Sequence, residues 1–389
     1  MLLTESASLT CRETLTVLGR AGVTADVISS GRWTIGQFSR WRGRSLRLPD
    51  PAQDPTAYLS ALDKASRDVD VVLPTHEQAW LIAAGRRLLA PGFPAAIADI
   101  TAFDRVQSKV EFARLLDELG LPQPRWWLPD ELPRTPVGPV WIKAAFGTAG
   151  RGVRRATSGS EVGRFVAELA EAGMPVMIQE EARGEYGQAQ ALFAHGLLVA
   201  VHTSVLVGQG MGGSAAARLS VDHPVARAAI GAIGAALNWH GGLTIDYIHV
   251  DGRPLIIECN PRTVEPGNAA AAGVNLPELS IGLTLGRLPG HFPVIGQPGV
   301  RTHSTLALAL GAAQGAGTRR AVLGSLPVGG GPVSTSEVLT PIREDRRSLV
   351  PLVVPVLRTL LAPGSAERIA TQATDRYAVT AAMVATVRQ

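Results

Sequence analysis

Two neighbouring segments, residues 243–250 and 255–260, alternate apolar and polar residues with the period of an extended strand. A glycine-containing turn separates them, and together they predict a β-hairpin. The apolar positions that should share its buried face are Leu243, Ile245, Tyr247, Leu255, Ile257 and Cys259. The other positions include two acids and an amide, Asp246, Glu258 and Asn260. This pattern constrains the fold strongly, because a strand period of two decides the face of every residue once the register is set.

The register depends on the loop between the two segments. A two-residue turn at Asp251 and Gly252 would pair Asp246 with Ile257 and would put the two apolar sets on opposite faces. The pattern therefore predicts an odd-numbered loop over residues 250–252, with Gly252 in a left-handed bulge conformation. With that register the acids and the amide lie on one face, which they share with Ile248, Val250 and Ile256.

A face that carries Asp246, Glu258 and Asn260 is costly to bury unless a cation lies between them. Their hard oxygen atoms suit Mg²⁺, with Mn²⁺ as the alternative ion, and magnesium usually also binds substrate phosphates. The other interpretation is a half-exposed hairpin whose polar residues face water. The metal site is favoured because β-propensity disfavours acids in mid-strand. In addition, Arg262 follows closely, and a guanidinium there could stabilise charge on a transferred phosphoryl group.

Lysine is rare in this chain, since only Lys64, Lys109 and Lys143 are lysines among 37 basic residues. Its compact charge fits a phosphate oxygen in a tight pocket better than the wide fork of arginine does. Lys143 ends a predicted strand and precedes a glycine-rich stretch, in which backbone N–H groups around Gly147, Gly150 and Gly152 could converge on a phosphate. An ordinary glycine turn is the alternative interpretation.

The first part of the chain predicts an α/β fold. Residues 1–104 alternate strands and helices in a βαβα pattern, which is typical of a parallel sheet. In such sheets ligands bind beyond the carboxyl ends of the strands, which indicates the loops around Ser6, Ser29 and residues 75–77. Residues 105–139 contain a helix that carries Lys109, with Asp104 as its predicted N-cap, and then a proline-rich linker.

Three further regions follow the linker. Residues 140–182 predict a small β-rich unit, and residues 183–290 predict a core of alternating strands with one helix at residues 225–237. Residues 291–389 are mostly helical, with predicted helices at 302–313, 355–361 and 367–384. They carry no chemical motif, and we expect them to pack on the rest of the chain or to form a homodimer contact.

Charge and hydropathy exclude several classes of protein. The formal net charge of +4 is small for 389 residues, and the basic residues are scattered, so a nucleic-acid partner has no support. The longest apolar run, residues 191–207, is interrupted by two histidines and a glycine, so no membrane span or signal peptide is predicted. Two cysteines give no disulfide framework. We therefore expect a cytoplasmic globular protein.

Beyond these separate features, the sequence IIECNPR at residues 256–262 resembles the E-x-N-P-R signature of the ATP-grasp enzymes. The flanking order is also similar: a helical lysine before LGLPQP, then VWIKAAFGTAGRGV, VMIQEEARGEYG and GGLTIDYI. The resemblance covers roughly residues 1–290. It implies an ATP-grasp fold with a parallel α/β domain before the ATP-binding part, a small β-rich lid, an α+β core and, here, an extra helical C-terminal segment.

The resemblance also implies roles for individual residues. Lys109 and Lys143 would contact ATP phosphates, while Arg262 would assist the transfer. The hinge at residues 179–182, which includes Gln179, Glu180 and Ala182, would meet adenine, and Glu185 would bind the ribose hydroxyls. The carboxylates and the amide of the hairpin would bind Mg²⁺.

Three other features also have a possible role in binding or closure of the site. Glu265 follows the signature and resembles a glutamate of the carboxylase branch that helps bicarbonate chemistry, although the spacing here is one residue shorter. The alternative interpretation of Glu265 is an ordinary solvated loop residue. His76 and Glu77 sit where the first domain would meet a substrate, or else serve the local structure. The glycine-rich residues 208–214 resemble a mobile cover over a water-sensitive intermediate.

The resemblance and the residues together predict an ATP-dependent carboxylate–amine ligase. Such an enzyme phosphorylates a small-molecule carboxylate, and an amine substrate then attacks the acyl phosphate, giving an amide, ADP and phosphate. The first alternative is a carboxylase or carbamoyl-phosphate-type enzyme that acts through carboxyphosphate. The second is a nucleotide-binding module without catalysis, which would have no need of both lysines, the acids and Arg262 together.

Overall fold

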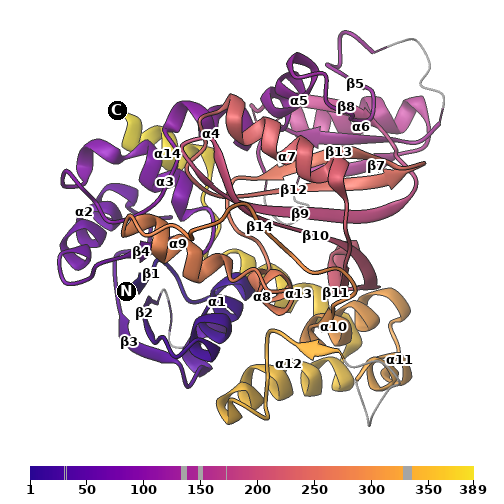
Figure 1. Ribbon diagram of the computed structural model, residues 1–389. Coiled ribbons are helices and arrows are strands. Elements are labelled where there is room, and N and C mark those ends of the chain that lie inside the picture. Colours follow the sequence, from indigo (N-terminus) through magenta and orange to yellow (C-terminus); the bar gives the residue numbers. More distant parts are fainter. Residues whose placement is uncertain (30, 32, 133–137, 148–151, 172, 327–334) are drawn as a thin grey trace.

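The computed structural model describes the chain except for residues 30, 32, 133–137, 148–151, 172 and 327–334. The described residues form three sheets, and helices cover their faces (Figure 1). No helix in this described part has the length and apolar character needed to cross a bilayer.

The N-terminal sheet is parallel, as the alternation of strand and helix signals predicts. Its four strands, β1 (Leu2–Leu3), β2 (Ala25–Ile28), β3 (Arg42–Leu46) and β4 (Val72–Leu73), lie in the order β3-β2-β1-β4. The helices α1 (Leu9–Arg20), α2 (Pro55–Ser66) and α3 (Gln78–Ala84) connect or follow them. Strand β3 has no counterpart in the sequence prediction, because its largely exposed residues show no apolar alternation.

The region around Lys109 differs from the prediction. Instead of one helix capped by Asp104, there are two, α4 (Ile100–Gln107) and α5 (Lys109–Glu118). Ser108 between them is extended, and its hydroxyl accepts the Glu111 N–H and caps α5. Asp104 lies inside α4 and pairs with Arg388. Lys109 is therefore the first residue of a helix, where its side chain can reach outward from the helix end.

A small antiparallel sheet forms the unit that we call the lid sheet. Its strands are β5 (Trp126–Trp127), β6 (Val140–Ala144), β7 (Val153–Ala156) and β8 (Val176–Glu180), in the order β5-β8-β6-β7, with α6 (Gly159–Ala170) packed on it. A compact core that includes Val140, Ile142 and Ile178 joins the helix to the sheet. The segment predicted as a linker thus contributes strand β5, which is too short to show a period.

The largest sheet has eight strands in the order β13-β12-β9-β10-β11-β15-β16, with β14 paired to β10. These strands are β9 (Glu185–Ala194), β10 (Leu197–Gln209), β11 (Ala215–Ser220), β12 (Gly241–Val250), β13 (Arg253–Asn260), β14 (Val294–Ile295), β15 (Arg301–His303) and β16 (Ser336–Glu337). The helices α7 (Pro224–Ala236), α8 (Pro266–Ala271) and α9 (Leu276–Thr284) accompany them. The last three strands come from the C-terminal hundred residues, which therefore extend the sheet.

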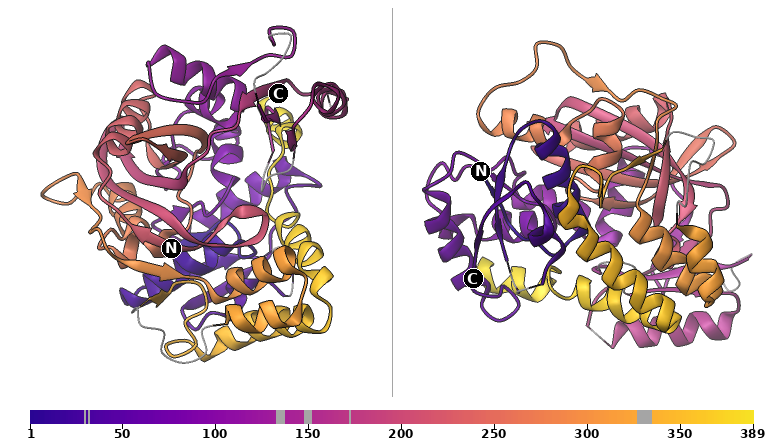
Figure 2. Two further views of the ribbon diagram at one scale, coloured as in Figure 1. Left: turned by 90° about the vertical axis from the view of Figure 1, so that its right-hand side faces the viewer. Right: turned by 90° about the horizontal axis from the view of Figure 1, so that it is seen from below.

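The C-terminal helices lie in two places (Figures 1 and 2). The helices α10 (Thr305–Ala316), α11 (Arg319–Ser325), α12 (Leu349–Leu361) and α13 (Ala366–Thr374) share a core that includes Leu306, Val322 and Val356. Helix α14 (Ala381–Arg388) instead packs on α2 and α3 of the N-terminal region. The single helix predicted at residues 367–384 is wrong, because a turn at residues 375–377 divides it.

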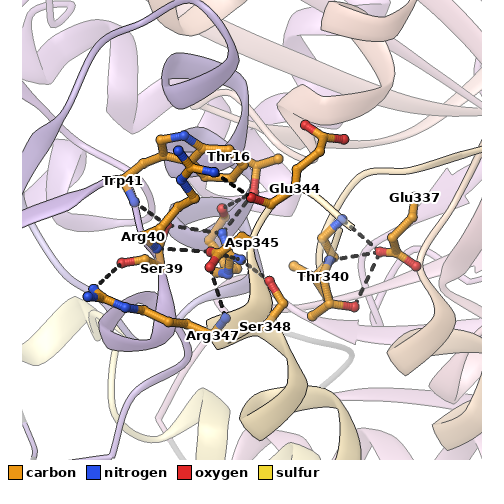
Figure 3. Close-up of polar contacts among 12 residues, drawn as sticks. Thr16, Ser39, Arg40, Trp41, Glu337, Thr340, Glu344, Asp345, Arg347 and Ser348 are labelled. Carbon is orange, nitrogen blue, oxygen red and sulfur yellow. Dashed lines mark hydrogen bonds and ion pairs between the residues drawn. The ribbon is translucent and has the colours of Figure 1, made fainter. Parts of the chain in front are cut away.

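A fully buried ion pair fixes the C-terminal segment to the N-terminal region. Arg12 on α1 and Asp345 are both completely inaccessible, and Nη2 of Arg12 lies 2.9 Å from Oδ2 of Asp345. The same carboxylate accepts the backbone N–H groups of Arg40 and Arg347, and Nη2 of Arg12 also donates to the Ser348 hydroxyl (Figure 3). Segments more than 300 residues apart in the sequence are thus joined by charge-assisted hydrogen bonds.

Candidate active site

The hairpin β12–β13 places its acids and amide on one face, but in a way that differs from the predicted loop. Its turn is the plain two-residue turn at Asp251 and Gly252, both with positive φ (47° and 81°). The extra residue lies inside the hairpin, where Asp246 pairs with Glu258 while Tyr247 pairs with Ile256. Ile257 is therefore a β-bulge, and this bulge supplies the odd shift that the alternation requires.

The bulge decides which residues enter the core. Cys259 is buried as predicted, and Ile256 is completely buried beside Tyr247. Leu255 and Ile257, which the pattern assigned to the core, are only half-buried. The pattern had placed the extra residue in the loop. Because the extra residue is Ile257 instead, the residues of β13 between the turn and the bulge face the opposite side from the one predicted.

The two acids of the hairpin face each other directly across the strands. Burial, together with the neighbouring Glu258, raises the pKa of Asp246 to about 6. Its Oδ1 accepts a hydrogen bond from Gln188 Nε2 at 3.0 Å, and its Oδ2 accepts one from Asn260 Nδ2 at 3.0 Å. Two opposed carboxylates with an adjacent amide form an oxygen-rich set that fits Mg²⁺.

No cluster of three or more acids, histidines or cysteines suitable for a metal occurs in the described residues. The two acids therefore could not enclose a cation on their own. Magnesium commonly completes its shell with water and substrate phosphates, so a shared site with a phosphate ligand fits this donor set.

Both lysines of interest reach the same cleft. Lys109 Nζ lies 3.4 Å from Glu258 Oε1 and donates to the Gly147 carbonyl at 3.4 Å. Lys143 Nζ donates to Gln179 Oε1 at 2.7 Å and to the Ile257 carbonyl at 3.2 Å. The bulge thus points the Ile257 carbonyl at a lysine of the lid sheet, and it joins the lid to the hairpin.

Charges in this cleft act on one another strongly. Burial lowers the pKa of Lys143 to about 8, which Glu258 opposes and Lys109 reinforces. Burial acts to raise the pKa of Glu258, but Lys109, Lys143 and Arg262 outweigh it and hold that pKa below its usual value. Three cations thus surround the ionised Glu258, while Asp246 pairs with it and Glu77 lies 3.9 Å from Arg262. Cations and acids lie side by side here, which suits a polyanion bound together with a divalent cation.

The cleft brings most of the expected residues together. Those that line it include Glu77, Lys109, Gly147, Gln179, Glu258, Asn260 and Arg262. The expected adenine and ribose residues Glu180, Ala182 and Glu185 lie further along the hinge, and Glu185 is exposed at the start of β9. Of the glycines, Gly152 has φ +74°, a conformation that favours glycine, whereas Gly150 lies outside the described residues.

Arg262 contacts the two residues expected from the first domain. Its Nη2 lies 3.4 Å from His76 Nε2, and its Nη1 lies 3.9 Å from Glu77 Oε1. Burial and Arg262 hold the pKa of His76 well below its usual value, so the imidazole is neutral. The ring of Tyr377, whose centroid is 4.3 Å away, packs on His76. Sequence reasoning missed Tyr377, since an ordinary tyrosine in a C-terminal turn carries no signal.

Glu265 lies apart from this cleft. Its backbone is left-handed, with φ 48°, and its Oε2 accepts a hydrogen bond from Arg218 Nε at 2.6 Å. It lines a second cavity together with Arg218 and Glu13, two residues that sequence reasoning also missed. The expected cover at residues 208–214 forms a short 3₁₀ turn (Met211–Gly213), and α10 holds it through a 2.7 Å bond from the Gly212 N–H to Gln314.

Comparison with known proteins adds a fold-level result. No protein-family model matches the sequence, and no curated protein matches it significantly. Solved structures do match. An L-amino acid ligase from Bacillus licheniformis aligns with a TM-score of 0.54 and 15% identity over 73% of each chain.

Two further structures align equally well. An N5-carboxyaminoimidazole synthetase from Staphylococcus aureus, complexed with ADP, aligns with a TM-score of 0.60 and 11% identity over 79% of this chain and 83% of that one. A biotin carboxylase from Campylobacter jejuni gives 0.55 and 15% over 75% and 72%. These likenesses agree with the arrangement of sheets described above, and this chain has the ATP-grasp fold.

Proposed function

We propose that this protein is an ADP-forming ligase that joins a carboxylate to an amine through an acyl phosphate. One observation carries the proposal. Glu258 lines one cleft with Lys109 and Arg262, Asp246 pairs with it directly across the hairpin, and Lys143 is near enough to lower the pKa of Glu258. The ATP-grasp fold supports it, and one structural neighbour is an L-amino acid ligase.

In this proposal the two lysines bind phosphates of ATP, and the lid sheet carries Lys143 toward them. Asp246, Glu258 and Asn260 would hold Mg²⁺, which when bound neutralises phosphate charge during transfer. Glu180, Ala182 and Glu185 on the hinge would bind the nucleoside, beside Gln179. Arg262, fixed by His76 and Glu77, presents its guanidinium to the transferred phosphoryl group.

The chemistry has two steps. An oxygen of the substrate carboxylate attacks the γ-phosphorus, the bond to the β-phosphate oxygen breaks, and ADP leaves. The nitrogen of a neutral amine then attacks the acyl carbon, and the bond from that carbon to the phosphate oxygen breaks. The amine nitrogen loses a proton, and inorganic phosphate departs with one oxygen of the original carboxylate.

A second function has a specific observation in its favour. Two of the three structural neighbours are an N5-carboxyaminoimidazole synthetase and a biotin carboxylase. Bicarbonate could thus replace the organic carboxylate, and the first step would then give carboxyphosphate.

The test is an ADP-release assay over panels of carboxylates, including amino acids, with and without amines, and with bicarbonate alone. We expect release that needs Mg²⁺, a carboxylate and an amine together. Glu258→Gln should abolish this turnover, whereas Asp251→Asn, an acid-to-amide change at the exposed turn of the same hairpin, should not. Release with bicarbonate alone would favour the second function, and equal activity of Glu258→Gln would refute the site.

A further inference from the structure

A second cavity lies on the same sheet as the candidate active site, between α1, β11, α8 and α10. Its lining has a charged end, formed by Glu13, Arg218, Glu265 and His303, and an apolar wall. The wall consists of small or aliphatic side chains, Leu9, Ala215, Ala216, Ala217, Ala307 and Val338. An apolar wall with a few convergent polar groups is typical of a small-molecule site.

The charged end holds more acid than base. Arg218 is 2% exposed, and its Nε donates to Glu265 at 2.6 Å. Glu13 is buried, and its Oε2 accepts the Gly267 N–H at 3.0 Å. Burial, and next Glu265, raise the pKa of Glu13 to about 8, so the acids here lie close together. A cationic group would relieve this crowding.

Arg218 itself is not fully satisfied. Its Nη1 is buried and has no hydrogen-bond partner among the described residues. A structural arginine at 2% exposure would normally use its donors, because an unpaired buried N–H is costly. Nη1 is therefore available to an oxygen of a ligand in the cavity.

The cavity is connected to the active site by a row of buried polar residues. Directly paired positions carry Asp246, Gln188, Ser204 and Ser220 across four strands, and Arg218 lies two residues from Ser220 on the same face. Gln188 Oε1 and Ser204 Oγ also have no partner in the described chain. This polar floor leads from the acids of the hairpin to the cavity.

We propose that this second cavity binds the amine substrate, with the ammonium group between Glu13 and Glu265 and an aliphatic substituent against the alanines of β11 and α10. The inference rests on the ligase function proposed above and specifies its acceptor as a cationic amine with a small apolar group. Arg218 Nη1 would take an oxygen of that substrate, such as the carboxylate of an amino acid. After the ammonium passes a proton to the carboxylate of Glu13, the amine nitrogen can attack the acyl carbon of an acyl phosphate held over the polar floor, and the bond from that carbon to the phosphate oxygen breaks.

The test compares a cationic amine with hydroxylamine, which is small and neutral and so has no need of an ammonium site. The cationic amine chosen for this test is the best acceptor that the wild-type enzyme shows in the substrate panel. Glu13→Gln keeps an oxygen for the Gly267 N–H but cannot ionise, so it removes the carboxylate that a bound ammonium would stabilise. We expect it to raise KM for the amine at least tenfold, while hydroxamate formation from hydroxylamine and KM for ATP change less than twofold. Glu367→Gln, at an exposed glutamate of α13, is the control.

A second variant tests the apolar wall. Ala307→Leu on α10 should lower kcat/KM for amines with larger substituents at least tenfold relative to ammonia. An unchanged amine KM in Glu13→Gln, or a parallel loss of amide and hydroxamate formation, would overturn the assignment of the cavity. Failure of the ligase function itself looks different, since wild-type enzyme would then form neither amide nor hydroxamate with any carboxylate.

Discussion

The affinity for ATP should depend on pH through Lys143. Among the described residues, its ammonium lies within hydrogen-bond distance of two neutral oxygens, those of Gln179 and Ile257, and burial lowers its pKa from 10.5 to about 8. That difference corresponds to about 3.4 kcal/mol by which the protein alone disfavours the charged form. A phosphate beside Lys143 would favour the charged form and raise the pKa again.

The sign of the effect follows from this shift. Below about pH 8 Lys143 is already charged, so the affinity that it contributes is fully present. Above that pH the free protein has lost the proton and must take it up on binding. ATP affinity should therefore fall by up to about tenfold per pH unit between about pH 8 and pH 10.

Isothermal titration with a non-hydrolysable ATP analogue and Mg²⁺ at pH 7.5, 8.5 and 9.5 measures the slope. Titration in two buffers of different ionisation enthalpy measures proton uptake. Lys143→Met should bind the ATP analogue weakly, and its affinity should not vary with pH. Lys64→Met, at the exposed lysine on α2, should keep both the affinity of wild type and its pH dependence. A wild-type affinity that varies less than twofold up to pH 9.5, or a slope that survives in Lys143→Met, would refute the reasoning.

Three other changes have defined outcomes. Asp345→Asn leaves Arg12 buried without its counter-charge and should lower the free energy of unfolding by about 3–5 kcal/mol in urea denaturation; a cost no larger than that of Glu344→Gln, in an exposed pair, would contradict this. Because Glu13 has a raised pKa, its stabilising contribution is present below about pH 4.5 and is lost as pH rises through about 8. The free energy of unfolding of Glu13→Gln should therefore rise relative to that of wild type between pH 5 and pH 8.5, on the order of a few kcal/mol. If the difference in urea midpoint between variant and wild type were the same at both pH values, the reasoning would be wrong. Arg262→Lys should lower kcat roughly 10²–10³-fold with little change in ATP affinity, and a proportional loss of both would assign Arg262 to ground-state binding.

Much of the fold follows from periodicity in the sequence. Helix α7 lies close to its predicted position at residues 225–237, and the strongly apolar strands β6 and β8 lie in the predicted β-rich unit at residues 140–182. Strands β3 and β5 were missed because an exposed strand or a pair of tryptophans has no period to read. The break at Ser108 was missed because two amphipathic helices in succession resemble one.

The hairpin shows what alternation can and cannot determine. Alternation predicted correctly that Asp246 and Glu258 share a face, but the odd-numbered loop over residues 250–252 was wrong, because the turn has two residues. It could not locate the extra residue, since a bulge at Ile257 and a three-residue loop give the same parity. Only the structure shows that the bulge also turns the Ile257 carbonyl to Lys143.

The candidate site likewise contains residues that the sequence indicates and residues that it does not. The lysines, the acids and Arg262 could be named from their spacing and their resemblance to a family. Lys109, Glu258 and Arg262 line one cleft, while Lys143 and Asp246 contact or pair with residues of its lining, and their roles remain proposals. Glu13, Arg218 and Tyr377 could not be named, because each reaches its partners through tertiary packing. Glu13, for example, contacts Gly267 across 254 positions of the chain. The residue types next to these positions in the sequence do not indicate such tertiary contacts.

The most direct test of the proposed function follows the oxygen atoms of the carboxylate. With the active carboxylate labelled with ¹⁸O, an acyl phosphate requires that one labelled oxygen leave with inorganic phosphate, which ³¹P NMR detects as an upfield-shifted signal. We predict one ¹⁸O in each phosphate released with amide, and loss of phosphate release in Glu258→Gln. Amide formation with unlabelled phosphate would contradict the account, as would ATP binding without ADP release for every carboxylate, amine and bicarbonate combination.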